Sequence, residues 1–353
     1  MQSCVLLCEA CVDLGSWLWA LPIFLGFAST LLICHFARPI GEALGLIDDP
    51  ARKSHSRHAE AVPLVGGLAV FFPVVLLELV AAVMAQFMYQ RTYWDTSAVF
   101  AAAVGVMTAI GLLDDRYHLS VRSRLVVTSM VFVAAVSMTP EFRIEELVIP
   151  FVGMALPIIF GWAAAPFTVL CLVALANAVN MADGRNGLVI GMGLIWTMAF
   201  LSASPAELPR GNLMLFASLL TVFVYNMQGK LFLGDGGTYG LATCFGLTAI
   251  WFHRYDGGLL SESQIASLFL IPCLDMVRLI ASRLRRGVSP FAADHDHLHH
   301  LLDNWMGWNR GLLVYLGLVA LPVLFAFSVP NWGGEALLLG AAAYLSLLLT
   351  ARP

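Results

Sequence analysis

Charged side chains are scarce in this sequence. They make up 12% of its 353 residues, about half of the ~25% that is usual in soluble domains. Hydrophobic residues reach 59%, against an ordinary ~45–50%. With 19 Lys+Arg and 23 Asp+Glu, the chain cannot cover a water-soluble surface, so the composition predicts a polytopic membrane protein. The net charge of −4 excludes a nucleic-acid binder that works through a basic face.

Cysteine is also sparse, and no disulfide scaffold is expected. Three of the seven cysteines are near the N-terminus, and four lie inside apolar stretches, where a thiol behaves as a small hydrophobe: Cys34, Cys171, Cys244 and Cys273. Internal repeats and low-complexity tracts are absent, so the inverted-repeat plan of many transporters has no support. Without a basic n-region or a small-residue cleavage site, the first apolar run is expected to be a retained span.

Long apolar runs define the organisation of the chain. A helix needs ~20 mainly apolar residues to cross a bilayer, and eleven candidates are present in one expected membrane domain over residues 1–353. They are 16–37, 66–88, 96–113, 121–139, 163–180, 187–204, 212–228, 237–253, 263–282, 311–329 and 333–350. The stretch 141–161 contains Pro150 and Pro157 among apolar, β-branched residues, which predicts an extended or hairpin segment at the membrane interface.

Basic residues set the orientation of these spans. One set of alternate loops carries thirteen of them: Arg38, Arg52, Lys53, Arg57, Arg116, Arg122, Arg124, Arg185, Lys230, Arg283, Arg285, Arg286 and Arg310. The opposite set carries four: Arg91, Arg143, Arg210 and Arg254. The positive-inside rule places the richer set in the cytoplasm. Eleven spans then put the N-terminus outside and the C-terminus inside.

Carboxylates gather in the same cytoplasmic loops. Asp48 and Asp49 follow the first span, Asp114 and Asp115 end the third, Asp183 follows the fifth and Asp235 the seventh, while four histidines lie between the ninth and tenth spans. Each feature alone has an ordinary explanation. An acidic pair at a helix end is usually solvated, and Asn-Met-Ala-Asp-Gly-Arg-Asn-Gly (180–187) and Gly-Asp-Gly-Gly (234–237) have the composition of turns.

The joint pattern indicates a specific chemistry. Carboxylates at the ends of several spans on one face converge only where the helices pack together, and they repel each other unless a cation lies between them. Oxygen ligands suit Mg²⁺, which binds one or two carboxylates together with substrate phosphates. Glycines beside Asp183 and Asp235 are expected to let backbone amides approach phosphate oxygens. We therefore expect phosphoryl transfer between a soluble phosphorylated substrate and a lipid at the cytoplasmic surface.

Seven segments in one order carry a family resemblance. They are Gly-Leu-Ile-Asp-Asp-Pro (45–50), Arg-Lys-Ser-His (52–55), Pro-Leu-Val-Gly-Gly (63–67), Gly-Leu-Leu-Asp-Asp-Arg (111–116), Asn-Ala-Val-Asn-Met-Ala-Asp-Gly (177–184), Lys-Leu-Phe-Leu-Gly-Asp (230–235), and Gly-Val-Ser-Pro-Phe (287–291) leading into His-Leu-His-His (297–300). Through them the chain resembles the polyprenyl-phosphate N-acetylhexosamine-1-phosphate transferases (glycosyltransferase family 4), especially the bacterial undecaprenyl-phosphate N-acetylglucosamine-1-phosphate transferases. The resemblance covers residues 38–302.

The resemblance implies a fold of about eleven transmembrane helices with cytoplasmic active-site loops in the bacterial inner membrane. It also implies a reaction, in which the phosphate of undecaprenyl phosphate attacks the phosphorus nearest the sugar of a UDP-N-acetylhexosamine, with Mg²⁺ (or Mn²⁺) as cofactor. UMP leaves, and a sugar-diphospho-lipid initiates an O-antigen, exopolysaccharide or related envelope polymer. Expected partners are these two substrates and the bilayer; the oligomeric state stays open, with a homodimer among the options.

Family likeness also implies residue roles. Asp114, Asp115 and Asp183 are the expected catalytic residues and, together with Asp235, the expected metal ligands, with Asp235 the first choice for direct Mg²⁺ binding. Arg285, His297, His299 and His300 are expected to hold the diphosphate and sugar of the donor. The remaining substrate-binding candidates are Asp48, Lys53, Arg122, Arg124, Asn180, Asn186, Asn226 and Lys230.

Two positions depart from the family pattern. Where the family usually has Asp-Gly-x-Asp-Gly, this chain has Asn186 as the fourth residue, which removes a charge. Where Gly-Asp-x-Gly-Ser is usual, Thr238 keeps a hydroxyl. Because an amide both donates and accepts hydrogen bonds, Asn186 is expected to bind the donor, with the charge carried by Asp183 and Asp235.

Three alternatives stand beside this interpretation. A transporter would carry its acids in the middle of its spans, whereas nearly all of them lie at span ends; Glu78, within the second span, is a functional candidate by default. A transition-metal site at residues 295–300 lacks a His-Glu-x-x-His helix and a partner cysteine. A phospho-N-acetylmuramoyl-pentapeptide transferase would show three consecutive histidines.

Asp275 and Arg278, three residues apart, are expected to pair with each other.

Overall fold

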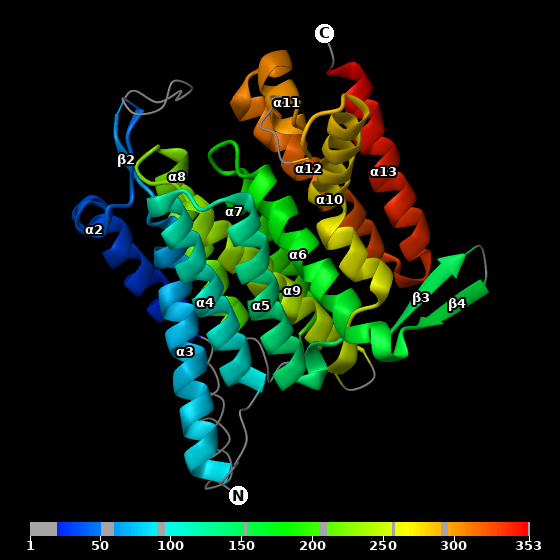
Figure 1. Ribbon diagram of the computed structural model, residues 1–353, viewed down its shortest axis with the longest axis horizontal. Helices are drawn as coiled ribbons and strands as arrows, with labels where there is room; N and C mark the ends of the chain where they lie inside the picture. Colours follow the sequence, from blue (N-terminus) through cyan, green and yellow to red (C-terminus); the bar gives the residue numbers. More distant parts are fainter. Residues whose placement is uncertain are drawn as a thin grey trace, which may run out of the picture.

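The structure is a computed structural model, and it describes residues 20–50, 60–89, 96–151, 154–204, 210–255, 258–290 and 296–351. A helix over Ala20–His35 is followed by twelve more in the described residues: α2 (Ala37–Leu44), α3 (Gly66–Tyr89), α4 (Thr96–Tyr117), α5 (Val121–Met138), α6 (Ala164–Ala182), α7 (Leu188–Ala203), α8 (Arg210–Met227), α9 (Gly234–Arg254), α10 (Glu262–Arg285), α11 (Leu298–Met306), α12 (Trp308–Ser328) and α13 (Gly333–Thr350). Figure 1 shows them as one bundle, with α11 at one end and a β-hairpin at the other.

Each of the eleven predicted apolar segments coincides with a described helix over most of its length, but a count of eleven membrane-spanning helices is not confirmed. Seven described helices are long and apolar enough to cross a membrane, or eight if the first helix and α2, which meet at a 65° bend, form one span. The helices α7 and α8 are apolar but shorter. The all-helical membrane fold is therefore supported, and residues 16–19 of the first predicted span lie outside the described part.

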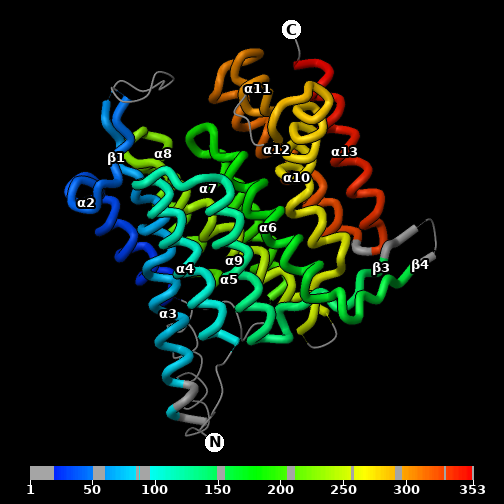
Figure 2. Tube along the Cα trace, in the orientation of Figure 1, coloured from blue at the N-terminus to red at the C-terminus, as the bar shows by residue number. Residues whose placement is uncertain are grey.

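The helix α9 shows why hydropathy alone is an incomplete guide to this fold. Sixteen of its 21 residues are buried, and it contacts α3, α4 and α6. Figure 2 shows α2–α4 on one flank and α10, α12 and α13 on the other, with α6 and α9 between them. Because other helices surround α9, its side chains do not need to be as apolar as those that face lipid.

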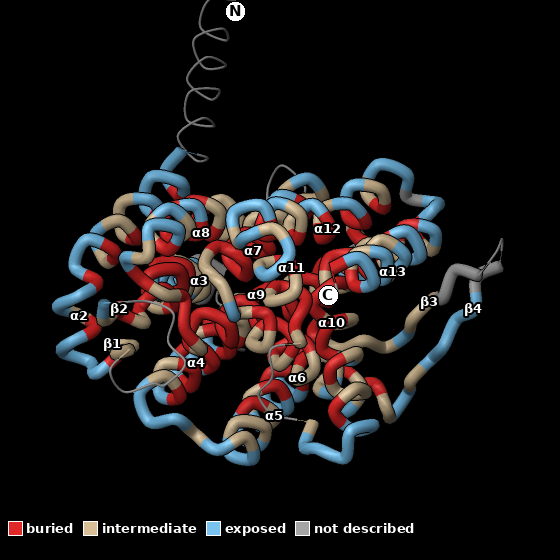
Figure 3. Tube along the Cα trace, turned by 90° about the horizontal axis from the view of Figure 1, so that it is seen from above, coloured by how far each residue is buried: buried red, intermediate tan, exposed pale blue. Residues whose placement is uncertain are grey.

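The exterior of the bundle is apolar around its sides. Figure 3 shows buried backbone in the centre and exposed backbone around the rim. Large hydrophobic side chains point outward from the peripheral helices, among them Phe87, Leu313, Leu338 and Leu349. Such a surface is unfavourable in water and favourable in the hydrocarbon of a bilayer.

Two small antiparallel sheets accompany the helices. β1 (Ile47–Asp48) pairs with β2 (Val62–Pro63) between α2 and α3. β3 (Glu146–Phe151) pairs with β4 (Met154–Ile159), with Glu146 opposite Ile159. The second pair confirms the extended or hairpin segment predicted over 141–161. The N-terminus of α5 is capped by the side chain of Ser120, and that of α10 by a capping box formed by Ser261 and Gln264.

Glycines allow three helices to meet at the start of α9. A methyl group added to Gly111 of α4 would lie 2.2 Å from the carbonyl oxygen of Asp235, and one added to Gly67 of α3 would lie 2.2 Å from the amide nitrogen of Gly237. No side chain fits at these distances, so the backbones themselves are in contact. Gly-Asp-Gly-Gly (234–237) is accordingly the first turn of a helix and not a loop turn.

This crossing predicts opposite effects for two Gly→Ala substitutions in α4. Gly111→Ala should force α4 and α9 apart and lower the midpoint of thermal unfolding in detergent by several degrees, which is roughly the effect of a small overpacking strain. Gly105→Ala is the matched control, because its added methyl would make an ordinary 3.4 Å contact with Val75. It should be neutral or stabilising by about 0.4–1 kcal/mol. Equal behaviour of the two variants would refute the close crossing.

Candidate active site

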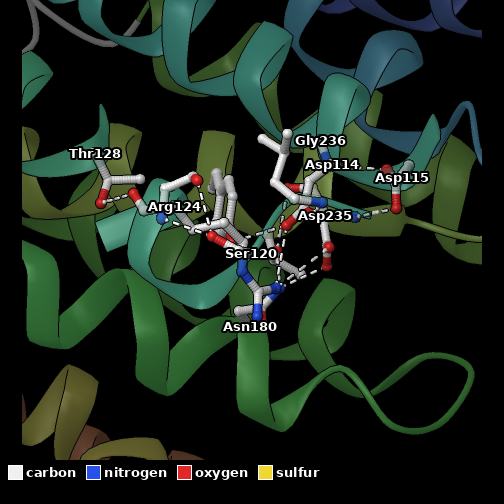
Figure 4. A network of polar contacts seen from close by, with 12 residues as sticks. Asp114, Asp115, Ser120, Arg124, Thr128, Asn180, Asp235 and Gly236 are labelled. Atoms are coloured by element: carbon white, nitrogen blue, oxygen red, sulfur yellow. Dashed lines mark hydrogen bonds and ion pairs between the residues drawn. The ribbon is translucent and has the colours of Figure 1, made fainter. Parts of the chain in front are cut away.

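The carboxylate of Asp114 is almost completely buried in the last turns of α4. Its Oδ1 accepts a hydrogen bond from the amide of Leu119 at 2.8 Å. Its Oδ2 accepts from Nη1 of Arg124 at 3.1 Å and from the hydroxyl of Tyr239 at 3.3 Å. A buried charge is tolerable when it is paired and hydrogen-bonded in this way. Asp114 therefore joins the ends of α4, α5 and α9 (Figure 4).

Asp115 caps the N-terminus of α9 from a different helix. Its Oδ1 accepts from the amide of Asp235 at 3.0 Å and its Oδ2 from the amide of Gly236 at 3.1 Å. These amides belong to the first turn of α9, where backbone donors have no partner within the helix. The expectation that the glycines beside Asp235 free backbone amides for phosphate is wrong for these two amides, because Asp115 already occupies them.

Asp235 lies between an amide and a guanidinium. Its Oδ1 accepts from Nδ2 of Asn180 at 2.6 Å, and its Oδ2 lies 4.0 Å from Nη1 of Arg124. Asn180 also donates to the hydroxyl of Thr238 at 3.1 Å, which ties α6 to α9. The side chain of Asp235 is 30% exposed, against 3% for Asp114. Asp235 is thus the more open of these two carboxylates.

Asp183 completes the acidic cluster at the end of α6. Burial and, to a smaller extent, the nearby negative charge of Asp235 together raise the pKa of its carboxyl to about 7. The convergence expected from the sequence is therefore confirmed: four aspartates from the ends of α4, α6 and α9 share one region. Their catalytic and metal-binding roles stay predictions.

The donor set of this cluster suits a hard divalent cation. Oxygen atoms from several carboxylates gather here, and the guanidinium of Arg124 contacts two of them. A divalent cation would offset the repulsion that burial makes costly. Among the described residues, no group of three or more His, Cys, Asp or Glu is arranged to hold a metal ion by itself. Mg²⁺ ordinarily binds one or two carboxylates and takes substrate phosphates and water as its other ligands.

The loop after α6 is held in place from two sides. The guanidinium of Arg185 pairs with the carboxylate of Asp303 in α11, and the carbonyl oxygen of Asn186 accepts from the indole of Trp308 at 2.8 Å. On the other side, the amide of Gly187 donates to Oδ1 of Asn226 at 2.6 Å. Nδ2 of Asn226 donates to the carbonyl oxygen of Leu231 at 2.9 Å. Both ends of the Asn226 amide thus hold backbone, a structural function that the sequence did not indicate.

The histidines lie against the same loop. The ring of His299 leaves no room for a side chain at Gly184, where an added methyl would lie 2.1 Å from Nε2. His299 is 1% exposed, and neither of its ring nitrogens has a hydrogen-bond partner in the described part of the chain. Burial, together with His300 and His297, lowers its pKa well below the ordinary value. The shift favours the neutral imidazole, which has one donor and one acceptor nitrogen.

The other predicted substrate-binding residues differ in their surroundings. Arg122 and Arg285 are exposed, and Nζ of Lys230 lies 5.7 Å from the ring centre of Tyr225. Asp48 is half-buried in β1. Lys53 and His295 lie outside the described residues. Of the predicted arginines, Arg124 is the one that reaches the carboxylates.

Three residues that sequence reasoning missed support the site: Tyr239, Thr238 as a partner of Asn180, and Trp308. Their partners are 58 to 125 positions away in the chain, so no local pattern indicates these contacts, not even the motif that contains Thr238. The helix α11 was also missed, since nine residues with a polar face are too short to register as a span.

Glu78 lines a cavity of about 310 Å³ near the start of α4, together with Thr96 and Ser97. That cavity is separated from Asp114 by 18 helical residues, about 27 Å.

Comparison with known proteins finds one family model and several similar transferases. Residues 97–253 match the family model described as glycosyl transferase family 4. The chain is 29% identical over 334 residues to the undecaprenyl-phosphate alpha-N-acetylglucosaminyl 1-phosphate transferase of Escherichia coli (strain K12), covering 87% of this chain and 84% of that protein. It is 28% identical over 316 residues to the protein of the same name from Yersinia pestis (83% and 79%). It is also 28% identical over 328 residues to a probable undecaprenyl-phosphate N-acetylglucosaminyl 1-phosphate transferase of Bacillus subtilis (strain 168) (91% and 85%).

The protein is thus a helical membrane protein whose acidic site lies at the helix ends. The resemblance to the glycosyl transferase family 4 enzymes that act on polyprenyl phosphates, which the motifs predicted, is confirmed by both kinds of match. The family match contains Asp114, Asp115, Asp183 and Asp235, and the longer alignments extend well beyond it on the same chain.

The bridge made by Asn226 gives a prediction for stability. Asn226→Ala leaves the buried amide of Gly187 and the carbonyl of Leu231 without their partners, at a cost of about 1–3 kcal/mol for each buried group. Asn226→Asp keeps the acceptor for Gly187 but brings a buried carboxylate oxygen against the carbonyl oxygen of Leu231, so it should also destabilise the protein. Gln228→Ala, two positions along on an exposed residue, is the control. Thermal unfolding in detergent measures all three, and an unchanged midpoint for Asn226→Ala would contradict the bridge.

Proposed function

We propose that this protein transfers N-acetylhexosamine 1-phosphate, specifically N-acetylglucosamine 1-phosphate, from its UDP derivative to undecaprenyl phosphate. One observation carries the proposal: four aspartates from three helix ends converge near the buried His299, whose ring nitrogens have no hydrogen-bond partner among the described residues. The names of the relatives from Escherichia coli and Bacillus subtilis agree with this reaction. They also favour it over a muramoyl-pentapeptide transferase.

In the proposed reaction, an oxygen of the lipid phosphate forms a bond to the phosphorus nearest the sugar. The bond from that phosphorus to the bridging oxygen breaks, and UMP leaves with that oxygen. Little covalent chemistry is required of the protein, because phosphoryl transfer depends on positioning and charge neutralisation. Mg²⁺ bound at the site would neutralise negative charge on the phosphates.

We infer distinct tasks for the side chains. Asp235 and Asp183 are the proposed Mg²⁺ ligands, since Asp235 is the more open carboxylate and Asp183 is close enough for their charges to interact. Asp115 holds the first turn of α9 and so fixes the backbone that carries Asp235. Arg124 lies between Asp114 and Asp235, where its remaining N–H groups suit phosphate oxygens. His297, His299 and His300 are proposed to hold the donor.

The proposed active site faces the cytoplasm of the bacterial inner membrane. Arg116 lies in the last turn of α4 and Arg285 ends α10, and both are exposed. Figure 1 shows α11 near one end of α10 and the β3–β4 hairpin projecting from the flank near its other end. This arrangement supports the orientation given by the positive-inside rule. A transporter is disfavoured, because the clustered carboxylates lie at helix ends and not along a path through the bundle.

The reaction predicts a specific dependence on its components. Purified protein should release UMP when Mg²⁺ or Mn²⁺, undecaprenyl phosphate and UDP-N-acetylglucosamine are all present, and omission of any one should abolish release. A panel of UDP-sugars, with UDP-glucose as the control that lacks the acetamido group, defines the donor. Nucleotide analysis by chromatography measures the product. Release of UDP in place of UMP would contradict the proposal, because it marks transfer of the sugar without its phosphate.

The division of labour in the loop after α6 is also testable. Asp183→Asn and Asp235→Asn should each lower kcat by about 10²-fold or more, the scale of losing a key electrostatic group. Asn186→Ala should mainly raise the KM for the UDP-sugar, which is the sign of lost uniform binding. Asn186→Asp restores the usual family residue and should stay active. Steady-state kinetics at several Mg²⁺ concentrations compare the variants. If Asn186→Ala lowers kcat as far as Asp183→Asn does, with KM unchanged, position 186 belongs to the catalytic group.

A further inference from the structure

A second buried aspartate organises the histidine motif from behind. Asp275 lies in α10 and is 5% exposed. The sequence predicted a pair with Arg278, and the structure confirms it: Nη2 and Nε of Arg278 donate to Oδ1 at 2.7 and 3.2 Å. The pair is only part of the arrangement, because Asp275 also contacts α11 and α13.

The other oxygen of Asp275 faces the histidines. Its Oδ2 accepts from the amide of Leu298, the first residue of α11, at 3.3 Å, and it lies 3.4 Å from Nδ1 of His297. Asp275 thus caps the start of α11 although it belongs to another helix, and a carboxylate at a helix N-terminus is favourable. An imidazole that donates its Nδ1 proton to a carboxylate also has its tautomer and ring orientation fixed.

The C-terminal helix takes part in the same contact. The hydroxyl of Tyr344 in α13 donates to Oδ1 of Asp275 at 2.8 Å and accepts from Nε of Arg278 at 2.8 Å. Nη2 of Arg278 donates to the carbonyl oxygen of Asp296, one residue before His297, at 2.5 Å. Arg278 therefore holds the backbone of residue 296, and Asp275 holds the ring of His297 and the backbone of Leu298. Tyr344 supports both of these side chains from α13.

This hold extends to the candidate active site through ring contacts. His297 stacks on His299 with ring centres 5.1 Å apart and an interplanar angle of 24°. His299 in turn contacts Gly184, next to Asp183. A change in the position of residue 297 is therefore transmitted to the ring whose nitrogens lack partners in the described residues.

We propose that Asp275, supported by Arg278 and Tyr344, is the positioning residue of the donor site: it fixes His297 and the first turn of α11 so that the histidines meet the UDP-sugar in one geometry. The inference rests on the proposed function for the identity of the ligand. Asp275 does not touch the donor in this scheme. Partners that orient a ligand-binding group from behind commonly change affinity or activity by roughly 10- to 100-fold when they are removed.

Tyr344→Phe is the mild test, since it removes one donor to Asp275 and keeps the ring in place. Tyr315→Phe is the matched control, because Tyr315 is as buried on the neighbouring α12 but is not among the donors to Asp275. Asp275→Asn removes the charge, and Asp275→Glu tests whether a carboxylate restores the function. Tyr344→Phe should raise the KM for the UDP-sugar by roughly tenfold and Asp275→Asn by more. The KM for undecaprenyl phosphate and the behaviour of Tyr315→Phe should stay unchanged.

A second measurement does not depend on transferase activity. Amide hydrogen exchange of residues 298–306 in detergent should be faster in Tyr344→Phe and Asp275→Asn than in the parent protein, and unchanged in Tyr315→Phe. If the parent protein transfers no sugar phosphate, the proposed function fails, while the exchange data still test the hold on α11. Unchanged exchange in Tyr344→Phe and Asp275→Asn, or a loss of thermal stability with an unchanged donor KM, would overturn the positioning role.

Discussion

The start of α9 is a helix end buried inside a helical bundle, and the site depends on how its backbone amides are satisfied. Burying free N–H groups would cost several kcal/mol in a medium without water. The carboxylate of Asp115 meets this need at Asp235 and Gly236, and it reaches them because Gly111, one turn earlier in α4, lets the two backbones touch. Glycine spacing and an acidic pair are therefore two parts of one arrangement, and together they place Asp235 beside Asp114.

Charge balance explains the rest of the acidic cluster. Asp114 is stabilised by Arg124 and Tyr239, and Asp235 by Asn180 and the more distant Arg124. Asp183 carries a carboxyl whose pKa is raised to about 7, because it is buried near a like charge. A group of carboxylates with this charge balance suits the divalent cation of the proposed reaction. Its place at helix ends agrees with the proposed reaction between a soluble nucleotide and a lipid phosphate.

The histidine motif and the loop after α6 form a second unit that faces this cluster. They are more than a hundred residues apart, yet Arg185 pairs with Asp303, Trp308 binds the carbonyl of Asn186, and His299 lies on Gly184. The departure at Asn186 is compatible with this unit, because its backbone anchors the loop whatever its side chain is. Behind the histidines, Asp275 performs for α11 what Asp115 performs for α9. In both cases a carboxylate of one helix caps the N-terminus of another.

The sequence by itself determined the helical membrane fold, the hairpin over 141–161, and the gathering of four aspartates at one end of the bundle. It could do so because hydropathy, basic loops and polar residues at span ends are local signals. It did not determine that Asp115 caps α9, that Asp235 is the more exposed carboxylate, or that Asn226 binds the backbone of Gly187 and Leu231. Those roles depend on partners far away in the chain. Nor did it reveal α11 or the contact of Tyr344 with Asp275, 69 positions away. Hydrophobic patterns fix which segments enter the membrane, whereas the pairing of buried polar groups is decided only when the helices pack and every donor must find an acceptor.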